Sequence, residues 1–532
     1  MENSNQIEPI SYLSNINTKN KNIRIEDNNI KSKDIHEDIL NYKLSLRKKE
    51  TQNKLMKIRL KNANKNKSKT LSGRQKMNEY KKLFDINKIE ETKYKLLDKN
   101  NNNYMKDKNV IELVYLYSQN VSSNENIQKI FDLKDNILIN LFLKEIINNI
   151  NSSTPIDLEL FDYYLLILGN FFIFTKSIQE TNEKECMNLF LNILNKNIAL
   201  ETYDNNNFDI INDTLWLIYL CIFFNNNEYL SHFAFIIQNI HILLSNQFFD
   251  ILAKYYKQND NKQLYMTIIK EIIYSELNIY SLIYEQIFEN ININNMPYIP
   301  NEIFQYSLDS LINLLNNNLV KNIYDENITN IIALIFCTQK NHKNITFSNN
   351  NFLETFCSLF NKYKYDNYDN NKISQNLIII LNKIIDNYYS DEIFLDILKD
   401  SDILPICIQY HLKNGSLINM TLVTLNLLFK YQMNYSKIII KCINYKLIEN
   451  VSDILSTTES NEKNCYGCLN TLINSHYFLE NNIKNPEYEN IIKYFNINNG
   501  LISKLEQLLL SNNKDIKELS YELYLKLKNY NN

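Results

Sequence analysis

From about residue 110 to the C-terminus, apolar segments of 10–15 residues alternate with short polar runs such as 205–207, 225–227 and 349–351. The most apolar segments centre on residues 166, 216, 268, 331, 378, 422 and 469. Their intervals of 44 to 63 residues fit armadillo or HEAT repeats, which span about 40–47 residues, with insertions. The pattern predicts an all-α solenoid, in which stacked helical units bury one another's inner helices.

The segments before residue 110 are more polar. Residues 1–35 contain too few apolar side chains to offset the entropy of ordering them, which predicts disorder. Residues 36–70 contain no Gly or Pro. Their apolar residues Leu40, Leu44, Leu55 and Ile58 fit one helical face. We expect a helix over about 38–60, a linker over 71–109, and about eight repeats over 110–532.

Charge is distributed unevenly along the chain. Between residues 41 and 69 there are eleven basic residues and one acid, Glu50, a window charge of +10. Because the formal charge of the whole chain is -3, the remainder carries -13. A basic arm is thus joined to an acidic body, and it could bind an acidic partner or fold back on that body.

Gly occurs only 5 times and Pro only 6 times, which favours long helices over a β-rich fold. The eight Cys are scattered singly through apolar segments, and the N-terminus has no signal-peptide core, which predicts a reduced, intracellular protein. The longest apolar stretches, 163–174 and 214–224, fall short of the ~18–20 residues that cross a bilayer, so we expect buried helices and no membrane insertion.

No arrangement of residues indicates catalysis. The six His show no HExxH or triad spacing, and the five dispersed Gly cannot form a phosphate-binding loop. Cys465 and Cys468 form one CxxC with only His476 nearby, whereas zinc needs four ligands, so two packed or surface thiols are favoured. We expect no enzyme activity, small-molecule substrate, metal or cofactor.

The segment 44–62 resembles the importin-β-binding helix that opens importin-α proteins. Leu46-Arg47-Lys48 matches the first part of that pattern, and Leu55-Met56-Lys57-Ile58-Arg59 matches the second, with Ile58 in place of a basic residue. The run of arginines that precedes the motif in the family is missing. The resemblance implies that importin-β binds Arg47, Lys48, Lys49, Lys54, Lys57, Arg59 and Lys61.

The body is similar to the armadillo repeats of the same family. Leu168-Gly169-Asn170 resembles part of the Trp-Ala-Leu-Gly-Asn segment of the second repeat, and Ile403-Leu404-Pro405 resembles the Leu-Ile-Pro that opens an inner helix. Residues 499–508 resemble the closing repeat. These matches run in family order from residue 44 to residue 530, and they imply a right-handed armadillo superhelix.

The resemblance implies a nuclear import adaptor that shuttles between cytoplasm and nucleus. In the family, a concave groove binds the nuclear-localisation signals of cargo proteins: Trp faces hold Lys side chains, and an Asn four residues later clamps the peptide backbone. Without cargo, the basic arm occupies the groove, and here Lys54, Lys57 and Arg59 would be its mimics. The corresponding groove positions are Leu166, Asn170, Trp216, Ile378, Asn382, Leu422 and Asn426.

The groove departs from the family pattern, because Trp216 is the only Trp and Leu220 stands four residues after it. No complete Trp–Asn pair is present, which leaves a divergent armadillo scaffold without cargo-signal binding as the first alternative. Trp216 could also be plain core. A second alternative is a basic-armed protein that docks on RNA or acidic membranes. The acidic body lacks an RNA-binding motif, so we do not expect direct nucleic-acid binding.

Overall fold

A computed structural model describes much of the chain from residue 85 onward. The described residues are 85–98, 102–121, 124–131, 137–152, 157–175, 183–198, 205–224, 233–244, 248, 250, 262–290, 300–317, 322–338, 351–364, 371–457, 461–482, 491 and 499–529. The predicted disordered N-terminus and the predicted basic helix lie outside these residues. The chain divides into two compact units, residues 1–132 and 133–532.

In the first unit, α3 (Ile86–Leu97) packs against α4 (Lys108–Asn120) and α5 (Glu125–Phe131), and the short helix η1 (Asn102–Lys106) precedes α4. Asp85 and Asp107 cap the first two of these helices, because each side chain accepts a backbone N–H two residues on. Helix α3 and η1 lie in the range 71–109, which the sequence analysis assigned to a linker. The apolar residues of α3 are few, but they share one face of the helix.

The second unit contains all the other described helices. Their bounds are α6 (Ile137–Asn151), α7 (Leu158–Thr175), α8 (Glu183–Ile198), α9 (Asn205–Phe224), α10 (Phe233–Ile240), η4 (His241–Leu244), α12 (Lys262–Asn290), α13 (Asn301–Asn316), α14 (Asp325–Thr338), α15 (Asn351–Lys362), α16 (Asn371–Asn387), α17 (Glu392–Asp400), α18 (Ile403–Gln409), η6 (His411–Lys413), α19 (Ile418–Lys430), α20 (Gln432–Asn444), α21 (Leu447–Thr457), α22 (Glu462–Asn481), α24 (Asn499–Leu508) and α25 (Lys514–Asn529).

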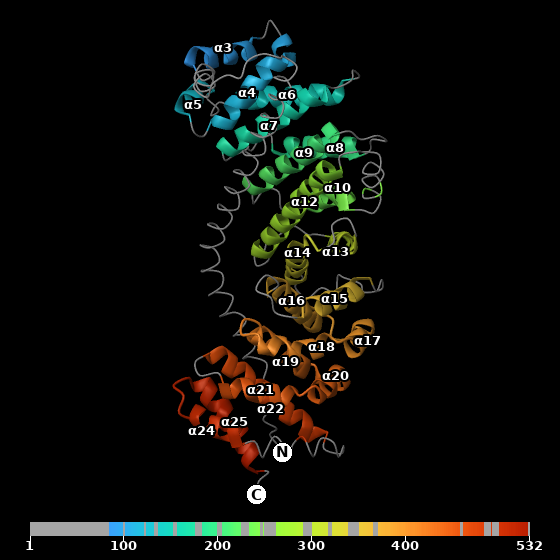
Figure 1. Cartoon of the computed structure of the whole chain (residues 1–532), viewed down its shortest axis with the longest axis vertical. Helices are drawn as coiled ribbons and strands as arrows, with labels where there is room; N and C mark the ends of the chain where they lie inside the picture. Colours follow the sequence, from blue (N-terminus) through green and yellow to red (C-terminus); the bar gives the residue numbers. More distant parts are fainter. Residues whose placement is uncertain are drawn as a thin grey trace, which may run out of the picture. The chain divides into compact units, whose positions relative to one another are not determined.

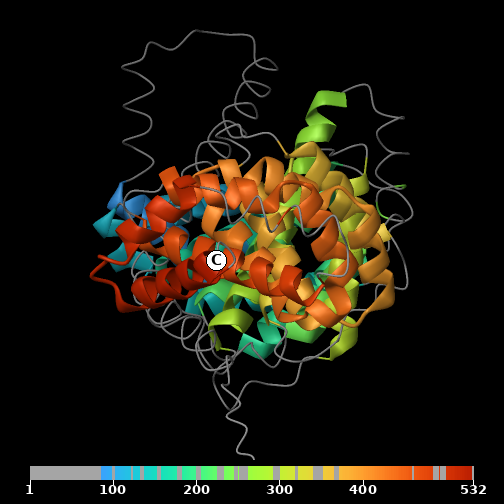
Figure 2. The same cartoon turned by 90° about the horizontal axis from the view of Figure 1, so that it is seen from below.

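Eight helices of the second unit form a continuous stack, which we call the ladder: α7, α9, α12, α14, α16, α19, α22 and α25. Each ladder helix packs on the next (Figure 1). In the view from below, the helices of this unit overlap along the line of sight (Figure 2). All seven apolar centres noted in the sequence lie on ladder helices, and the described residues form helices without a strand. The prediction of an all-α solenoid is confirmed.

The later repeats have the three-helix form of armadillo proteins. Helices α17, α18 and α19 form one repeat, and α20, α21 and α22 form the next. The outer helices stack as well, since α17 packs on α20, and α18 packs on α21. A ladder helix inside the stack is therefore enclosed by its own repeat and by both neighbouring repeats, which buries its apolar side chains.

The abundant Asn is used at helix ends. Asn461 and Asn513 accept backbone N–H groups at the starts of α22 and α25. Near helix C-termini, an Asn side chain instead donates to the carbonyl four residues earlier, in a chain where Gly caps are scarce. Residues with this bond are Asn120, Asn149, Asn197, Asn239, Asn361 and Asn482.

Two helices, α7 and α9, are long and apolar enough to cross a membrane when judged by length and composition alone. The sequence analysis underestimated their length because it counted only the most apolar stretches, 163–174 and 214–224. Both helices belong to the ladder, and most residues of their apolar windows are buried within the protein. Core helices of proteins outside membranes pass the same test.

Glu276 is an ionisable group without compensation in the core. It lies on α12 with an exposed fraction of 0%, and neither carboxylate oxygen has a hydrogen-bond partner within the described part of the chain. Burial raises the pKa of this carboxyl well above its ordinary value. The carboxyl is therefore neutral in the folded protein and ionised in the unfolded chain near neutral pH.

Replacing Glu276 with Leu is expected to stabilise the protein at pH 7 by about 1–3 kcal/mol, since no charge then has to be neutralised on folding. A raised folded pKa gives stability that is lost as pH rises above the unfolded value. The difference in thermal midpoint, measured by circular dichroism, should thus be larger at pH 8 than at pH 5. Glu285→Leu, on a partly exposed residue of the same helix, is the control, and equal shifts for both variants would contradict the prediction.

His411, in η6, presents the opposite case. Its exposed fraction is 3%, both ring nitrogens lack hydrogen-bond partners among the described residues, and its ring packs 5.9 Å from that of Phe360. Burial lowers the pKa of this imidazole to about 4. The ring is therefore neutral when folded.

Stability that depends on neutral His411 is expected to fall as pH drops from the unfolded value near 6.5 toward 4, by about 2 kcal/mol at pH 5. His411→Leu should remove this component, so that its unfolding free energy declines less between pH 7 and pH 5. The same substitution at the partly exposed His241 is the control. Parallel pH profiles for the unmodified protein and His411→Leu, measured by urea unfolding, would refute this assignment.

Candidate functional site on the ladder

The ladder helices inside the stack, α7 to α22, each expose one side, and these sides together we call the ladder face. A helix enclosed by its outer helices and by both ladder neighbours has a single remaining direction toward solvent. Partly exposed residues in the middle of these helices, such as Leu166 on α7 and Trp216 on α9, mark that direction. The ladder face therefore follows the whole second unit.

All seven predicted groove residues lie on ladder helices. Leu166, Asn170, Trp216, Asn382 and Asn426 are partly exposed on the ladder face. The exposed fractions of Ile378 and Leu422 are both 0%, so these side chains present no surface to a partner in this structure.

Neighbouring residues are exposed instead. Ile379 is partly exposed on α16, and Val423 is 46% exposed on α19. Each lies three residues before the Asn of its helix rather than four. The sequence alone could not show this difference, because residues three or four apart share a face of an α-helix and packing against neighbours decides which of the two is covered.

Trp216 and Gly169 connect the first two ladder helices. A Cβ atom at Gly169 would lie 2.1 Å from Cζ3 of Trp216 and 2.6 Å from Cη2, so the indole ring occupies the space that any other residue would fill. The sequence analysis noted both residues for their rarity without linking them. One face of the ring is therefore covered by α7.

Asn382 and Asn426 hold ladder helices together. The Nδ2 atom of Asn382 donates to the carbonyl of Met420 on α19 at 3.5 Å, and that of Asn426 donates to the carbonyl of Gly467 on α22 at 3.5 Å. Asn474 donates in turn to Oδ1 of Asn426 at 3.1 Å. These amides cross-link successive ladder helices in this structure.

A third Asn continues this series. Asn382, Asn426 and Asn470 are spaced by 44 residues, and all three are partly exposed. Asn470 was missed, although Tyr466 stands four residues before it and the spacing of 44 residues would have revealed it. Gly467, at the position that corresponds to Val423, allows Leu422 to approach within 3.0 Å of where its Cβ would be.

Ion pairs join the ladder helices from α14 onward. Glu326 pairs with Lys372 at 3.3 Å, Asp386 with Lys430 at 3.1 Å, and Glu480 with Lys526 at 3.9 Å. Each pair spans consecutive ladder helices and is at least partly exposed. The hydroxyl of Tyr431 also donates to Asp386 at 2.7 Å, and its ring stacks on that of Tyr389, 4.5 Å between centroids.

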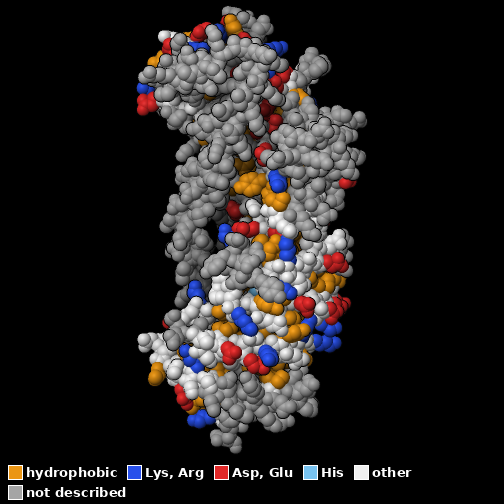
Figure 3. All heavy atoms as spheres, viewed as in Figure 1, with side chains coloured by type: hydrophobic (Ala, Val, Ile, Leu, Met, Phe, Trp, Pro, Cys, Tyr) orange, Lys and Arg blue, Asp and Glu red, His pale blue; other side chains and the backbone are white. Residues whose placement is uncertain are grey.

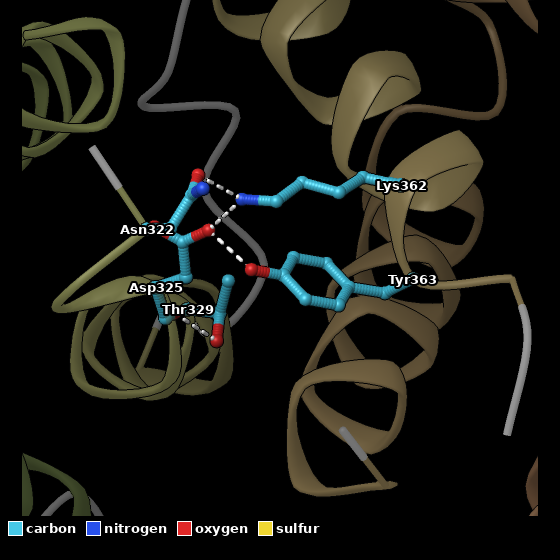
Figure 4. A network of polar contacts seen from close by, with 5 residues as sticks. All are labelled: Asn322, Asp325, Thr329, Lys362 and Tyr363. Atoms are coloured by element: carbon cyan, nitrogen blue, oxygen red, sulfur yellow. Dashed lines mark hydrogen bonds and ion pairs between the residues drawn. The ribbon is translucent and has the colours of Figure 1, made fainter. Parts of the chain in front are cut away.

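A further polar network connects α14 with the outer helix α15 (Figure 4). The buried carboxylate of Asp325 accepts from Tyr363 and pairs with Lys362, whose ammonium group also donates to Asn322. Asn322 adopts a positive φ of 70°, a conformation that Asn tolerates better than most residues. The network fixes the chain entry into α14 and so the position of this ladder helix.

Among the described residues drawn in Figure 3, hydrophobic side chains are scattered between charged ones. The described residues include no group of three or more His, Cys, Asp or Glu able to hold a metal ion. Cys465 and Cys468 are buried on α22, in agreement with the expectation of packed thiols. The residues assigned to importin-β binding lie outside the described part of the chain.

Comparison with families and with curated proteins finds no match to this sequence. Solved structures do match. A crystal complex of SYS-1 and POP-1 aligns with a TM-score of 0.49 and 15% identity, over 84% of this chain and 75% of that chain. A structure describing a phosphorylation switch in the interaction between cadherin and β-catenin gives a TM-score of 0.29 and 10% identity, over 84% and 96%. The assignment to an armadillo-type solenoid is made from the three-helix repeats and their packing.

Gly169→Ala is expected to displace the Trp216 ring and to destabilise the protein by about 1–3 kcal/mol. Because Trp216 is the only Trp, the emission maximum of the protein should shift with it. Gly415→Ala is the matched control, since a Cβ there meets nothing within 4 Å. An unchanged emission spectrum and thermal midpoint for Gly169→Ala would contradict this packing.

Proposed function

We propose that this protein is a nuclear transport adaptor of the importin-α type, which binds an extended cargo segment on its ladder face and importin-β through its basic arm. It would shuttle between cytoplasm and nucleus with its cargo. The observation that carries the proposal is the continuous ladder face, which follows in the chain an N-terminal arm whose sequence resembles the importin-β-binding pattern. Neither feature involves a catalytic group.

The shape of the ladder face suits an extended peptide. Every ladder helix from α7 to α22 carries partly exposed side chains, so the series continues from one repeat to the next. An extended chain advances about 3.3–3.6 Å per residue, so about every two to three residues a side chain meets the next ladder helix, which lies about 8–10 Å further on. Amide, aromatic and aliphatic groups line this face in the form of Asn170, Trp216, Ile379, Val423 and Asn426.

A second candidate function is a divergent armadillo scaffold that assembles other proteins but has lost cargo-signal binding. Three observations favour it. Trp216 has one face against Gly169, Asn382 and Asn426 bond to neighbouring helices, and Ile378 and Leu422 are buried. The basic arm opposes it, because a scaffold without cargo has no need of an importin-β-binding pattern.

The two functions differ in their dependence on importin-β. The full chain is expected to retain importin-β in a pulldown at moderate salt, and a variant with Arg47, Lys48, Lys57 and Arg59 changed to Ala should lose it. The reason is that these four residues occupy basic positions of the importin-β-binding pattern. Bound importin-β is measured on a gel at several salt concentrations.

The control variant changes Lys65, Lys67, Lys69 and Arg74 to Ala, which removes the same charge from outside the motif. If the control variant retains importin-β and the first variant loses it, importin-β recognises the motif itself. The positive charge of the arm in general would then not be sufficient for binding. If neither the full chain nor the control retained importin-β, the adaptor function would be excluded and the scaffold favoured.

A further inference from the structure

The amides of Asn382 and Asn426 make the same kind of contact at two successive interfaces of the ladder. Each donates at 3.5 Å to a backbone carbonyl of the next ladder helix, Met420 on α19 for Asn382 and Gly467 on α22 for Asn426. The contact therefore recurs from one repeat to the next.

These amide bonds are weak because each acceptor is shared. The carbonyl of Met420 also accepts the hydroxyl of Thr424 at 3.1 Å, and that of Gly467 accepts the hydroxyl of Thr471 at 2.8 Å. In an α-helix the same carbonyl accepts the N–H four residues on, and its oxygen has only two lone pairs. The Asn amide is thus a third donor, beyond the usual distance of about 2.7–3.2 Å, and its release costs little.

Asn382 gains a hydrogen bond when its amide is released. Its Oδ1 atom is buried and has no hydrogen-bond partner within the described part of the chain. A buried acceptor without a partner is unfavourable. Once the amide turns outward, a backbone N–H of a partner segment can satisfy Oδ1, so this position is ready to bind.

Asn426 is held more firmly, because a second amide occupies its oxygen. Nδ2 of Asn474 donates to Oδ1 of Asn426 at 3.1 Å, while Nδ2 of Asn426 donates to Gly467 on the same helix, α22. The oxygen and nitrogen of a carboxamide share one carbon, so the whole polar end of Asn426 faces α22. To bond to both the C=O and the N–H of a partner's backbone, this amide must turn and break both bonds.

We infer that Asn474 is a latch, which holds the Asn426 amide against α22 until the backbone of a partner segment displaces it. The inference rests on the proposed function, because the segment is the one that the ladder face would bind. The oxygen of Asn382 carries no such bond within the described residues, so Asn382 engages the segment first. The latch makes binding at α19 and α22 depend on a segment that is already engaged at α16.

Removing the latch tests the inference on the full chain with the same four Ala substitutions in its arm, which weaken competition from the arm. Asn474→Ala is added to this parent chain, and Asn481→Ala, at an exposed position in the last turn of α22, is the matched control. The probe is a labelled peptide of about 20 residues with one Lys-rich cluster, long enough to run from α7 to α22 at about 3.3–3.6 Å per residue. Affinity is measured by fluorescence anisotropy.

The Asn474→Ala chain is expected to bind the peptide about fivefold more tightly than the parent chain, because one hydrogen bond no longer has to be broken. Adding Asn426→Ala to this variant should abolish the gain, and Asn481→Ala should bind like the parent. A residue that only supports the fold would act in the opposite direction, since a loosened α22 weakens binding.

A double-mutant cycle gives a second measure. Without peptide, Asn426→Ala and Asn474→Ala should be coupled in their effects on the free energy of unfolding, because each removes the bond between the two amides. With saturating peptide the coupling should vanish, since the peptide has already broken that bond. Urea unfolding with and without peptide measures both couplings.

Equal or weaker binding by the Asn474→Ala chain would overturn the inference, and so would a gain that survives Asn426→Ala or a coupling that persists with peptide bound. The proposed function would stand in each case on the binding of the peptide by the parent chain. If neither the parent nor any variant bound the peptide, the proposed function would fail together with the inference.

Discussion

The fold depends on a single constraint: a ladder helix has more apolar surface than its own repeat can cover. Helices α7 and α9 are apolar on nearly every side, and they are buried only because other ladder helices lie against them. Their apolar character thus reflects a position between repeats. The same constraint leaves a ladder helix inside the stack with only one side exposed to solvent.

The repeat architecture was predictable because this burial leaves a periodic trace in the sequence. Centres such as those at residues 166, 331 and 469 coincide with ladder helices, although the repeats themselves vary in length. Helix α3 was missed because only three of its residues, Ile89, Thr92 and Leu96, are buried. So few buried residues in a polar segment do not stand out in the amino-acid composition. The length of α9 was underestimated for a related reason, since Asn and Asp residues continue the helix beyond its apolar run.

The site was less predictable than the fold. The sequence placed the candidate residues on ladder helices but could not show that Ile378 is buried and Ile379 partly exposed, because one residue of rotation decides burial and depends on neighbouring repeats. Nor could it show that Asn426 donates across to α22, since that bond joins residues 41 positions apart. Roles that depend on contacts between repeats require coordinates, and residues 1–84 are outside the part described.

The ion pairs between ladder helices contribute little to what holds the solenoid together. Exposed pairs such as Glu326 with Lys372 each contribute less than about 1 kcal/mol, and salt screens them. The contacts between successive ladder helices therefore depend mainly on buried apolar side chains, which salt does not screen. High ionic strength should thus weaken the charged surface of the later repeats without loosening their stack.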